Sequence, residues 1–201
     1  GGQFVPPNDS HLIDCVNAVE QVRTMEWEDA AKSRFVSWLD GPAYKAYLKL
    51  VSDQAAPASN QYALAFTGLH GAGTWSVPPV LRMAGFLVHE EPEQAVADGA
   101  FTSVPGRAPN PEIPACMEQG TRFAENYGCS LLLGTDPDAD RIGASVRSGG
   151  EWRFLTGNEI AALTVYRALS RHPSPTTAIV MKTEVTSQLV TRIADSFGAK
   201  C

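Results

Sequence analysis

From residue 62 onward, short apolar runs that suit β-strands alternate with longer segments whose apolar residues recur at helical spacing. The predicted strands are 62–66, 86–88, 130–133, 142–147, 152–155 and 178–181, and the predicted helices are 77–84, 115–127, 157–169 and 185–197. Such alternation is typical of an α/β protein with helices on both faces of a central sheet. The sequence therefore predicts a three-layer α/β/α domain with a mixed, largely parallel sheet, in which 142–147 and 152–155 form an antiparallel hairpin.

The first quarter of the chain is predicted to be mostly helical, with helices near residues 9–19, 35–39 and 43–51. At the other end, the elements after residue 155 amount to one helix–strand–helix unit, which is too small to bury its own apolar faces. We therefore expect two domains: an α/β/α domain over residues 1–155 and an incomplete second α/β domain over residues 156–201.

The charge of the chain limits its partners. Its 201 residues include 16 Lys and Arg against 22 Asp and Glu, a formal net charge of -6, which argues against binding to nucleic acid or to an anionic membrane. The longest uncharged run, residues 54–81, is interrupted by Pro and Gly, so it does not suit a membrane-spanning helix. The four cysteines lack the spacing of a zinc or redox site. We expect a cytoplasmic protein, and the sequence leaves its oligomeric state open.

The sharpest chemical signal is an acidic segment, Gly134-Thr135-Asp136-Pro137-Asp138-Ala139-Asp140-Arg141, which follows the apolar run 131–133. In an extended strand, alternate side chains lie about 6.6 Å apart, too far for three carboxylates to bind one ion at the ~2.1 Å distances of Mg2+. The segment must therefore curl, and Pro137 favours a turn. Once curled, Asp136, Asp138 and Asp140 offer hard oxygen ligands that suit Mg2+ or Ca2+.

Other interpretations of this segment differ in their support. An EF-hand is excluded, because Arg141 stands where that loop needs Gly and Arg147 where it needs Glu. A phosphatase that uses Asp136 as its nucleophile remains open on local geometry. A solvated acidic turn also remains open, although three adjacent carboxylates repel one another unless a cation neutralises them. Arg141 offsets one of these charges and has the donor geometry to bind a phosphate.

A glycine-rich segment, Gly68-Leu69-His70-Gly71-Ala72-Gly73-Thr74, lies between a predicted strand and a predicted helix. Its glycines match neither the dinucleotide-binding fingerprint nor the Walker loop, so we expect tight packing of strand against helix here. His70 has two interpretations, an acid or base that titrates near neutrality and a hydrogen-bonded structural residue, and we favour the second.

Five motifs in order along the chain resemble the phosphoglucomutase/phosphomannomutase family, the α-D-phosphohexomutases. They are Phe-Thr-Gly-Leu-His-Gly-Ala-Gly (66–73), Ala-Asp-Gly-Ala-Phe-Thr-Ser-Val (97–104), Pro-Asn-Pro-Glu (109–112), Gly-Thr-Asp-Pro-Asp-Ala-Asp-Arg (134–141) and Leu-Thr-Gly-Asn-Glu (155–159). The resemblance implies a four-domain enzyme of which this chain is the second domain and the opening of the third. It implies phosphoryl transfer from a phosphoserine to a sugar phosphate, through a bisphosphate, that exchanges the 1-phosphate and the 6-phosphate of a hexose.

By the same resemblance, Asp136, Asp138 and Asp140 bind Mg2+, Arg141 is an active-site residue near the transferring phosphate, and Lys182 contacts the substrate. The family's phosphoserine, sugar-recognition and phosphate-binding loops have no counterpart among these 201 residues. We therefore expect the isolated chain to bind metal weakly and to catalyse nothing. A phosphopentomutase of the same family and a non-catalytic metal-binding or interaction module are the alternatives.

Overall fold

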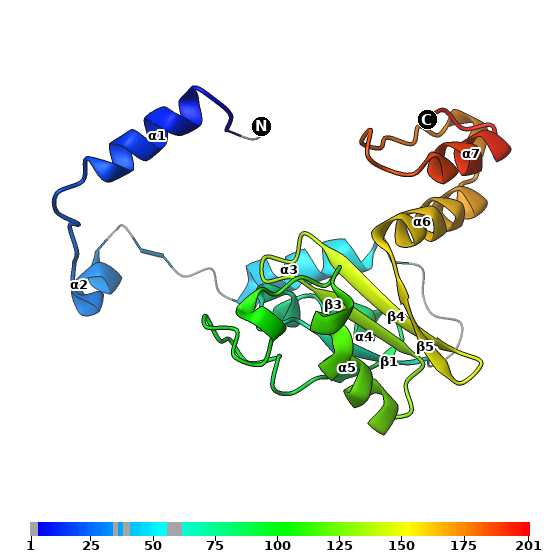
Figure 1. Cartoon of the computed structure of the whole chain (residues 1–201), viewed down its shortest axis with the longest axis horizontal. Coiled ribbons are helices and arrows are strands. Elements are labelled where there is room, and N and C mark those ends of the chain that lie inside the picture. Colours follow the sequence, from blue (N-terminus) through cyan, green and yellow to red (C-terminus); the bar gives the residue numbers. More distant parts are fainter. Residues whose placement is uncertain (1–3, 34–35, 38–40, 56–61) are drawn as a thin grey trace. The chain divides into compact units, whose positions relative to one another are not determined.

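The computed structural model describes residues 4–33, 36–37, 41–55 and 62–201, and it divides into two units, residues 1–44 and 45–201 (Figure 1). The first unit contains α1 (Asn8–Asn17) and α2 (Trp27–Lys32), and α3 (Gly41–Ser52) begins in it and continues into the second. The helices expected near residues 9–19 and 43–51 are confirmed as α1 and α3. The sequence analysis did not predict α2, and the helix that it expected over 35–39 lies mostly outside the described residues. Within the described part of the chain, no helix has the length and apolar character to span a bilayer.

Five strands form one mixed sheet in the second unit. They are β1 (Ala63–Thr67), β2 (Leu87–Glu90), β3 (Leu131–Thr135), β4 (Ile142–Ser148) and β5 (Glu151–Leu155), in the order β2-β1-β3-β4-β5. All five match predicted strands. The sheet is mixed as expected, but only β1–β2 and β1–β3 are parallel, while β3–β4 and β4–β5 are antiparallel. The reason is the short connection 136–141, because a parallel return to β3 would need a crossover of a dozen or more residues.

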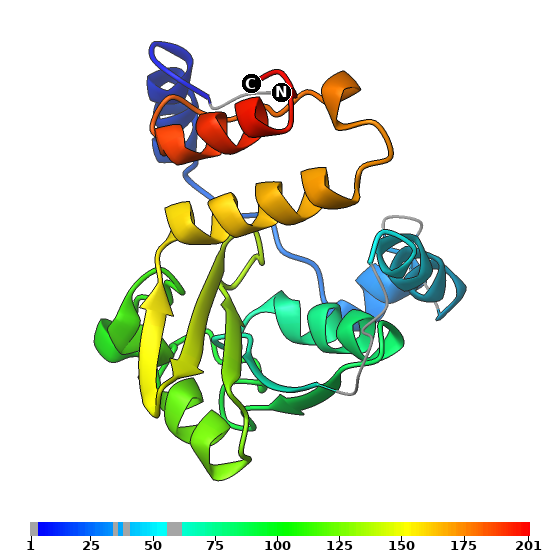
Figure 2. The same cartoon turned by 90° about the vertical axis from the view of Figure 1, so that its right-hand side faces the viewer.

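Helices cover both faces of this sheet, as the sequence predicts (Figures 1 and 2). Side chains alternate along β1, so that Leu64 and Phe66 pack with Val77 and Leu81, which belong to α4 (Val77–Met83) on one face. Ala65 points to the other face and packs with Met117 of α5 (Pro114–Asn126). The three-layer α/β/α architecture is therefore confirmed, and the carboxyl ends of β1 and β3 lie side by side in its middle layer.

After β5 the chain forms α6 (Gly157–Arg171), a short 3-10 helix (Pro175–Thr177) and α7 (Gln188–Ser196), shown in orange and red in Figure 2. These elements have an apolar cluster of their own, built on Leu169, Ala194 and Ala199. The strand predicted over 178–181 is wrong: only Ile179 forms a bridge, with Lys200. Residues 178–181 have only a single bridge partner, Lys200, and no adjacent strand among the described residues with which to form a ladder of backbone hydrogen bonds. The domain boundary expected between residues 155 and 156 stays a prediction.

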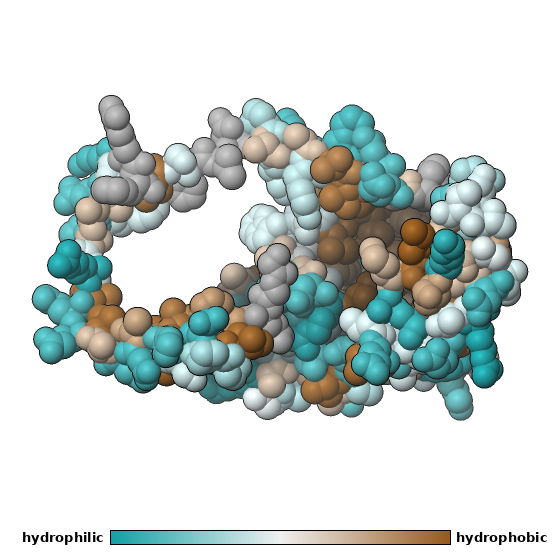
Figure 3. Space-filling model, turned by 90° about the horizontal axis from the view of Figure 1, so that it is seen from above, coloured by the Kyte–Doolittle hydropathy of each residue, from teal (hydrophilic) through white to brown (hydrophobic). Residues whose placement is uncertain are grey.

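Hydrophobic side chains remain exposed at several places on the molecular surface (Figure 3). In the C-terminal segment they include Ile179, Met181 and Val185, and in α1 they include Leu12, Ile13 and Val16. The exposure of Ile179, Met181 and Val185 agrees with the expectation that the elements after residue 155 cannot bury all of their apolar side chains.

Candidate metal centre

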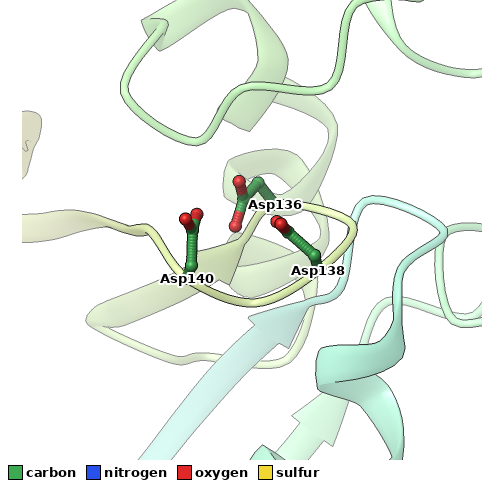
Figure 4. A group of neighbouring side chains, drawn as sticks. All are labelled: Asp136, Asp138 and Asp140. Carbon is green, nitrogen blue, oxygen red and sulfur yellow. The ribbon is translucent and has the colours of Figure 1, made fainter. Parts of the chain in front are cut away.

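The acidic loop, residues 136–141, connects β3 to β4 and carries three aspartates whose carboxylates face a common space (Figure 4). Asp136 directly follows the last residue of β3 and is buried, whereas Asp138 and Asp140 are exposed. One carboxylate oxygen from each residue lies within 4.8 Å of the other two. The loop is curled, as predicted, because it connects two antiparallel neighbouring strands, β3 and β4, as a hairpin loop.

Arg141 is bound to the innermost of these carboxylates. Its backbone amide donates to Asp136 Oδ1 at 3.0 Å and its Nε donates to Asp136 Oδ2 at 2.8 Å. The same guanidinium group lies 3.7 Å from Asp140 Oδ1 and 3.9 Å from Glu112 Oε2. The Arg141 side chain is 43% exposed, so part of it still reaches solvent while its Nε holds Asp136.

The charges of the loop are unevenly balanced. Burial raises the pKa of Asp136, but the hydrogen bonds that it accepts from the Arg141 amide and guanidinium outweigh burial and leave that pKa below its ordinary value. The pKa of Asp140 is raised, because it shares a hydrogen bond with Asp136 and lies beside the negative charge of Asp138. One arginine therefore does not neutralise three carboxylates. The donor set, all carboxylate oxygens at short mutual distance, fits a hard divalent cation.

The glycine-rich turn, residues 68–74, lies against the acidic loop. The Ala72 amide donates to the Pro137 carbonyl oxygen at 2.8 Å, and Gly71 packs on the Pro137 backbone. The turn after β1 and the loop after β3 thus meet at the carboxyl edge of two neighbouring parallel strands. Tight packing at these glycines was predicted, but the sequence analysis placed it between strand and helix and did not anticipate the acidic loop as the partner.

His70 is a structural residue, which confirms the favoured interpretation. Its Nδ1 lies 2.8 Å from the Val96 carbonyl oxygen, and its Nε2 lies 2.8 Å from the Ser103 hydroxyl. The side chain is buried and its backbone has φ +67°. Both ring nitrogens are engaged in these contacts, so His70 ties the glycine-rich turn to residues 96–103.

Lys182 forms its hydrogen bond outside the acidic loop. Its Nζ donates to the Thr186 carbonyl oxygen at 3.1 Å, and the side chain lines a hollow of about 480 Å³ together with Ile142, Gly157 and Ile160. Among the described residues, no hydrogen bond or ion pair joins Lys182 to residues 136–141. The structure therefore brings Asp136, Asp138, Asp140 and Arg141 together, and the substrate contact expected of Lys182 stays a prediction.

Sequence reasoning gave no role to Glu112, although it recorded the Pro-Asn-Pro-Glu motif that ends with this residue. In the structure, Pro111 is buried against Gly143 of β4, where a Cβ would lie 3.0 Å from Pro111 Cβ. This packing places the next residue, Glu112, within ion-pair distance of Arg141. The sequence signal that could have pointed to Glu112 was its place directly after Pro109 and Pro111, which restrict the backbone before it.

Residues 43–149 match the family model described as "Phosphoglucomutase/phosphomannomutase, alpha/beta/alpha domain II". The match covers more than half of the chain and includes both the glycine-rich turn and the acidic loop. The chain belongs to this family. The acidic loop and its arginine are therefore features of a phosphoglucomutase/phosphomannomutase domain II, in agreement with the motif resemblance.

Several curated proteins of the family are similar to almost the whole chain. A phosphomannomutase of Mycoplasmoides pirum is 28% identical over 203 residues, covering 98% of this chain and 36% of that protein. A phosphoglucomutase of Staphylococcus saprophyticus is 28% identical and covers 100% and 37%, respectively. A phosphoribomutase of Saccharomyces cerevisiae is 27% identical and covers 98% and 36%. The chain thus spans little more than a third of the length of these relatives.

A solved structure supports the fold. A phosphoglucomutase/phosphomannomutase family protein from Burkholderia thailandensis superposes with a TM-score of 0.64, covering 79% of this chain and 32% of that one. At 16% sequence identity, this likeness concerns the fold alone.

Proposed function

We propose that this chain is the metal-binding part of a sugar-phosphate mutase, in which Asp136, Asp138 and Asp140 hold Mg2+ and Arg141 binds the transferring phosphate. The observation that carries the proposal is the convergence of three carboxylates within 4.8 Å of one another beside an arginine that is bound to the innermost of them. The names of the similar proteins, phosphomannomutase, phosphoglucomutase and phosphoribomutase, support the class of reaction.

The residues of the site would have different roles in the reaction. When bound, Mg2+ neutralises negative charge on a phosphoryl group as it is transferred. Asp136 holds the guanidinium group of Arg141 through Nε, so that its exposed side is oriented to donate to phosphate oxygens. Glu112 and Asp140 flank the same group at 3.9 and 3.7 Å and add to its orientation. The contribution of these residues is electrostatic and positional, whereas the covalent step, transfer of the phosphoryl group from a phosphoserine to the sugar phosphate, would use a serine outside these 201 residues.

We infer a hexose phosphate as substrate, converted between its 1-phosphate and 6-phosphate through a phosphoserine and a bisphosphate intermediate. Two of the three similar proteins described above are named for hexoses, whereas the yeast relative is named phosphoribomutase. That name supports a pentose phosphate as the second candidate. In either case the phosphoserine and the sugar-recognition and phosphate-binding loops would be supplied by other parts of the protein, and these 201 residues would provide domain II and the beginning of domain III.

Metal binding is tested on the 201-residue chain by calorimetric titration with Mg2+. We expect Asp138→Asn to weaken binding by at least about tenfold, because it removes a charged ligand and leaves the Asp136–Arg141 pair intact. The matched control is Asp195→Asn, which makes the same change at an exposed position of α7. If Asp138→Asn binds Mg2+ as tightly as the unaltered chain, the assignment of the site is wrong.

The reaction is tested with the product of the complete coding sequence, assayed with glucose 1-phosphate, mannose 1-phosphate and ribose 1-phosphate. We expect conversion of a hexose phosphate by that protein and none by the 201-residue chain. Turnover by the isolated chain would contradict the proposal, and an inactive complete protein that binds Mg2+ would favour a non-catalytic module. Phosphorylation of the chain that Asp136→Asn abolishes would instead indicate the phosphatase.

A further inference from the structure

The residues of the acidic loop alternate in the direction they face. Asp136, Asp138 and Asp140 point into a common space, whereas the residues between and before them, Thr135, Pro137 and Ala139, lie against the glycine-rich turn. The loop therefore has a ligand side and a packing side, and one turn from another strand forms the surface under the packing side.

Two glycines of that turn make the close approach possible. A Cβ at Gly71 would lie 2.6 Å from the carbonyl oxygen and 2.8 Å from the carbonyl carbon of Pro137. A Cβ at Gly73 would overlap Thr135 Oγ1 and would lie 3.5 Å from Ala139 Cβ. The backbone of Gly71 has φ -99°, which any residue adopts, so this glycine is required for space and not for conformation.

The contact between the glycine-rich turn and the acidic loop also includes one backbone hydrogen bond and one hydroxyl group without a hydrogen-bond partner. The Ala72 amide, between the two glycines, donates to the Pro137 carbonyl oxygen at 2.8 Å. Thr135 Oγ1 is buried and has no hydrogen-bond partner among the described residues. The Thr135 hydroxyl therefore limits the side chain at Gly73 by steric contact and not by a hydrogen bond.

We propose that Gly71 and Gly73 are positioning residues of the metal centre: the turn that carries them sets the curl of the acidic loop and thereby the convergence of the three aspartates. The inference rests on the proposed function in taking the aspartates as ligands of a divalent cation. Mg2+ demands near-ideal octahedral geometry with short ligand distances. A methyl group at Gly71 would lie 2.6 Å from the Pro137 carbonyl oxygen, well inside the ordinary contact distance of about 3.5 Å, so we expect the loop backbone to shift and the carboxylates to move with it.

The test compares Mg2+ affinity of Gly71→Ala and Gly73→Ala with that of Gly99→Ala, measured by calorimetry on the 201-residue chain. Gly99 is an exposed glycine outside the positive-φ region with nothing within 4 Å of an added Cβ, so it controls for the substitution itself. We expect both turn variants to bind at least about tenfold more weakly, as for other residues that orient metal ligands, and Gly99→Ala to bind as the unaltered chain. Unchanged affinity in both turn variants would overturn the inference.

A rescue experiment separates positioning from a general loss of stability. In Gly73→Ala the added methyl group overlaps Thr135 Oγ1, and Thr135→Ala removes that atom. We expect Thr135→Ala alone to retain Mg2+ affinity, because its hydroxyl has no partner, and the double variant to regain most of the affinity that Gly73→Ala loses. A double variant that binds no better than Gly73→Ala would contradict the role of this contact.

Amide hydrogen exchange provides a readout that needs no metal. The Ala139 amide donates to the Asp136 carbonyl oxygen at 3.0 Å and the Arg141 amide to Asp136 Oδ1, so both report the curl of the loop. We expect these amides to exchange about tenfold faster in Gly71→Ala, with the amides of α7 unchanged. If the unaltered chain binds no Mg2+, the proposed function fails while exchange still decides the inference. If Gly71→Ala loses its helical circular dichroism, Gly73→Ala and its rescue decide it.

Discussion

Arg141 holds Asp136 at both carboxylate oxygens, through its backbone amide at 3.0 Å and its Nε at 2.8 Å. Asp136 is buried, and a buried carboxylate that loses its partner destabilises the folded state because water cannot replace the lost hydrogen bonds. The pair therefore links the stability of the domain to the arginine that we propose binds phosphate.

Arg141→Gln keeps the backbone donor and removes the positive charge. We expect the midpoint of thermal unfolding to fall by about 2–6 °C without metal and the deficit to shrink in Mg2+, because a bound cation would neutralise Asp136. The measurement is a thermal melt with and without Mg2+. Arg122→Gln, which removes an exposed arginine 3.8 Å from Glu118, should change the midpoint by less than about 1 °C. An equal fall of the unfolding midpoint in the two variants would show that the Asp136–Arg141 pair stabilises the domain no more than an exposed ion pair does.

Gln94 is the centre of a buried polar network that holds the glycine-rich turn. Its side-chain carbonyl accepts from Thr67 Oγ1 at 2.6 Å and its amide donates to Ser103 Oγ, which also contacts His70. Gln94 and Thr67 are both fully buried, so no water can replace Gln94 at the Thr67 hydroxyl, whereas Ser103 is half-buried. The network connects the end of β1 to the segment that follows β2.

Gln94→Leu leaves the Thr67 and Ser103 hydroxyl groups without this partner. We expect the free energy of unfolding in urea to fall by about 1–3 kcal/mol, the cost of leaving the buried Thr67 hydroxyl without this partner. Gln188→Leu, at an exposed position of α7, should cost less than about 0.5 kcal/mol. A loss as small as that of the control would mean that the network adds nothing to stability.

Asp98 shapes the loop that carries Ser103. It accepts hydrogen bonds from the Thr102 hydroxyl and amide and from the Ala100 amide, which lower its pKa from 3.8 to about 2. A carboxyl group whose pKa is depressed in the folded state stabilises that state above its unfolded pKa, and this contribution disappears as the pH falls through the folded value.

We therefore expect Asp98→Asn to be less stable than the unaltered chain at pH 6, with the difference shrinking between about pH 4 and pH 2. Urea unfolding at several pH values measures this. Asp195→Asn, at an exposed position of α7, should show no such convergence. A difference that stays constant down to pH 2 would contradict the role of the Asp98 carboxylate.

Thr156 and Glu159 form a capping box at the start of α6. Thr156 Oγ1 accepts from the Glu159 amide at 3.3 Å, and Glu159 accepts from the Thr156 amide at 2.8 Å. We expect Thr156→Ala to destabilise by about 1 kcal/mol, because two amides at the helix end lose a partner or its orientation.

Hydrogen exchange of the first turn of α6 measures the local effect of this substitution. Thr164→Ala removes the same atoms from the middle of the helix, where alanine is the better helix former, and should not increase exchange in the first turn. Equal exchange there in Thr156→Ala and the unaltered chain would exclude a contribution of the capping box.

Local features of the molecule followed from the sequence. The runs 62–66, 86–88 and 130–133 became β1, β2 and β3, because short apolar runs bounded by turn residues suit the strands of a sheet that helices cover on both faces. The spacing of Asp136, Asp138 and Asp140 required a curl whatever the surrounding fold, since an extended chain keeps alternate side chains too far apart for one ion. Each of these conclusions depends on residues within a few positions of one another.

Pairings across the chain did not follow in the same way. The antiparallel return of β4 beside β3 is set by the short connection 136–141, whereas the absence of a strand at 178–181 depends on which neighbouring strands are available. Residues 178–181 do not specify a partner strand by themselves, because every residue except proline carries the same backbone donor and acceptor.

Residue patterns were enough to predict a three-layer α/β domain and an acidic loop with three carboxylates and an arginine, and they favoured a structural role for His70 over an acid or base. The folded chain added that Asp136 is the buried member of the three, that Glu112 flanks Arg141, and that Gly71 and Gly73 lie under the acidic loop. The physical reason is distance along the chain. More than sixty residues separate the glycine-rich turn from the acidic loop, and they meet because β1 and β3 pair in parallel and end at the same edge of the sheet.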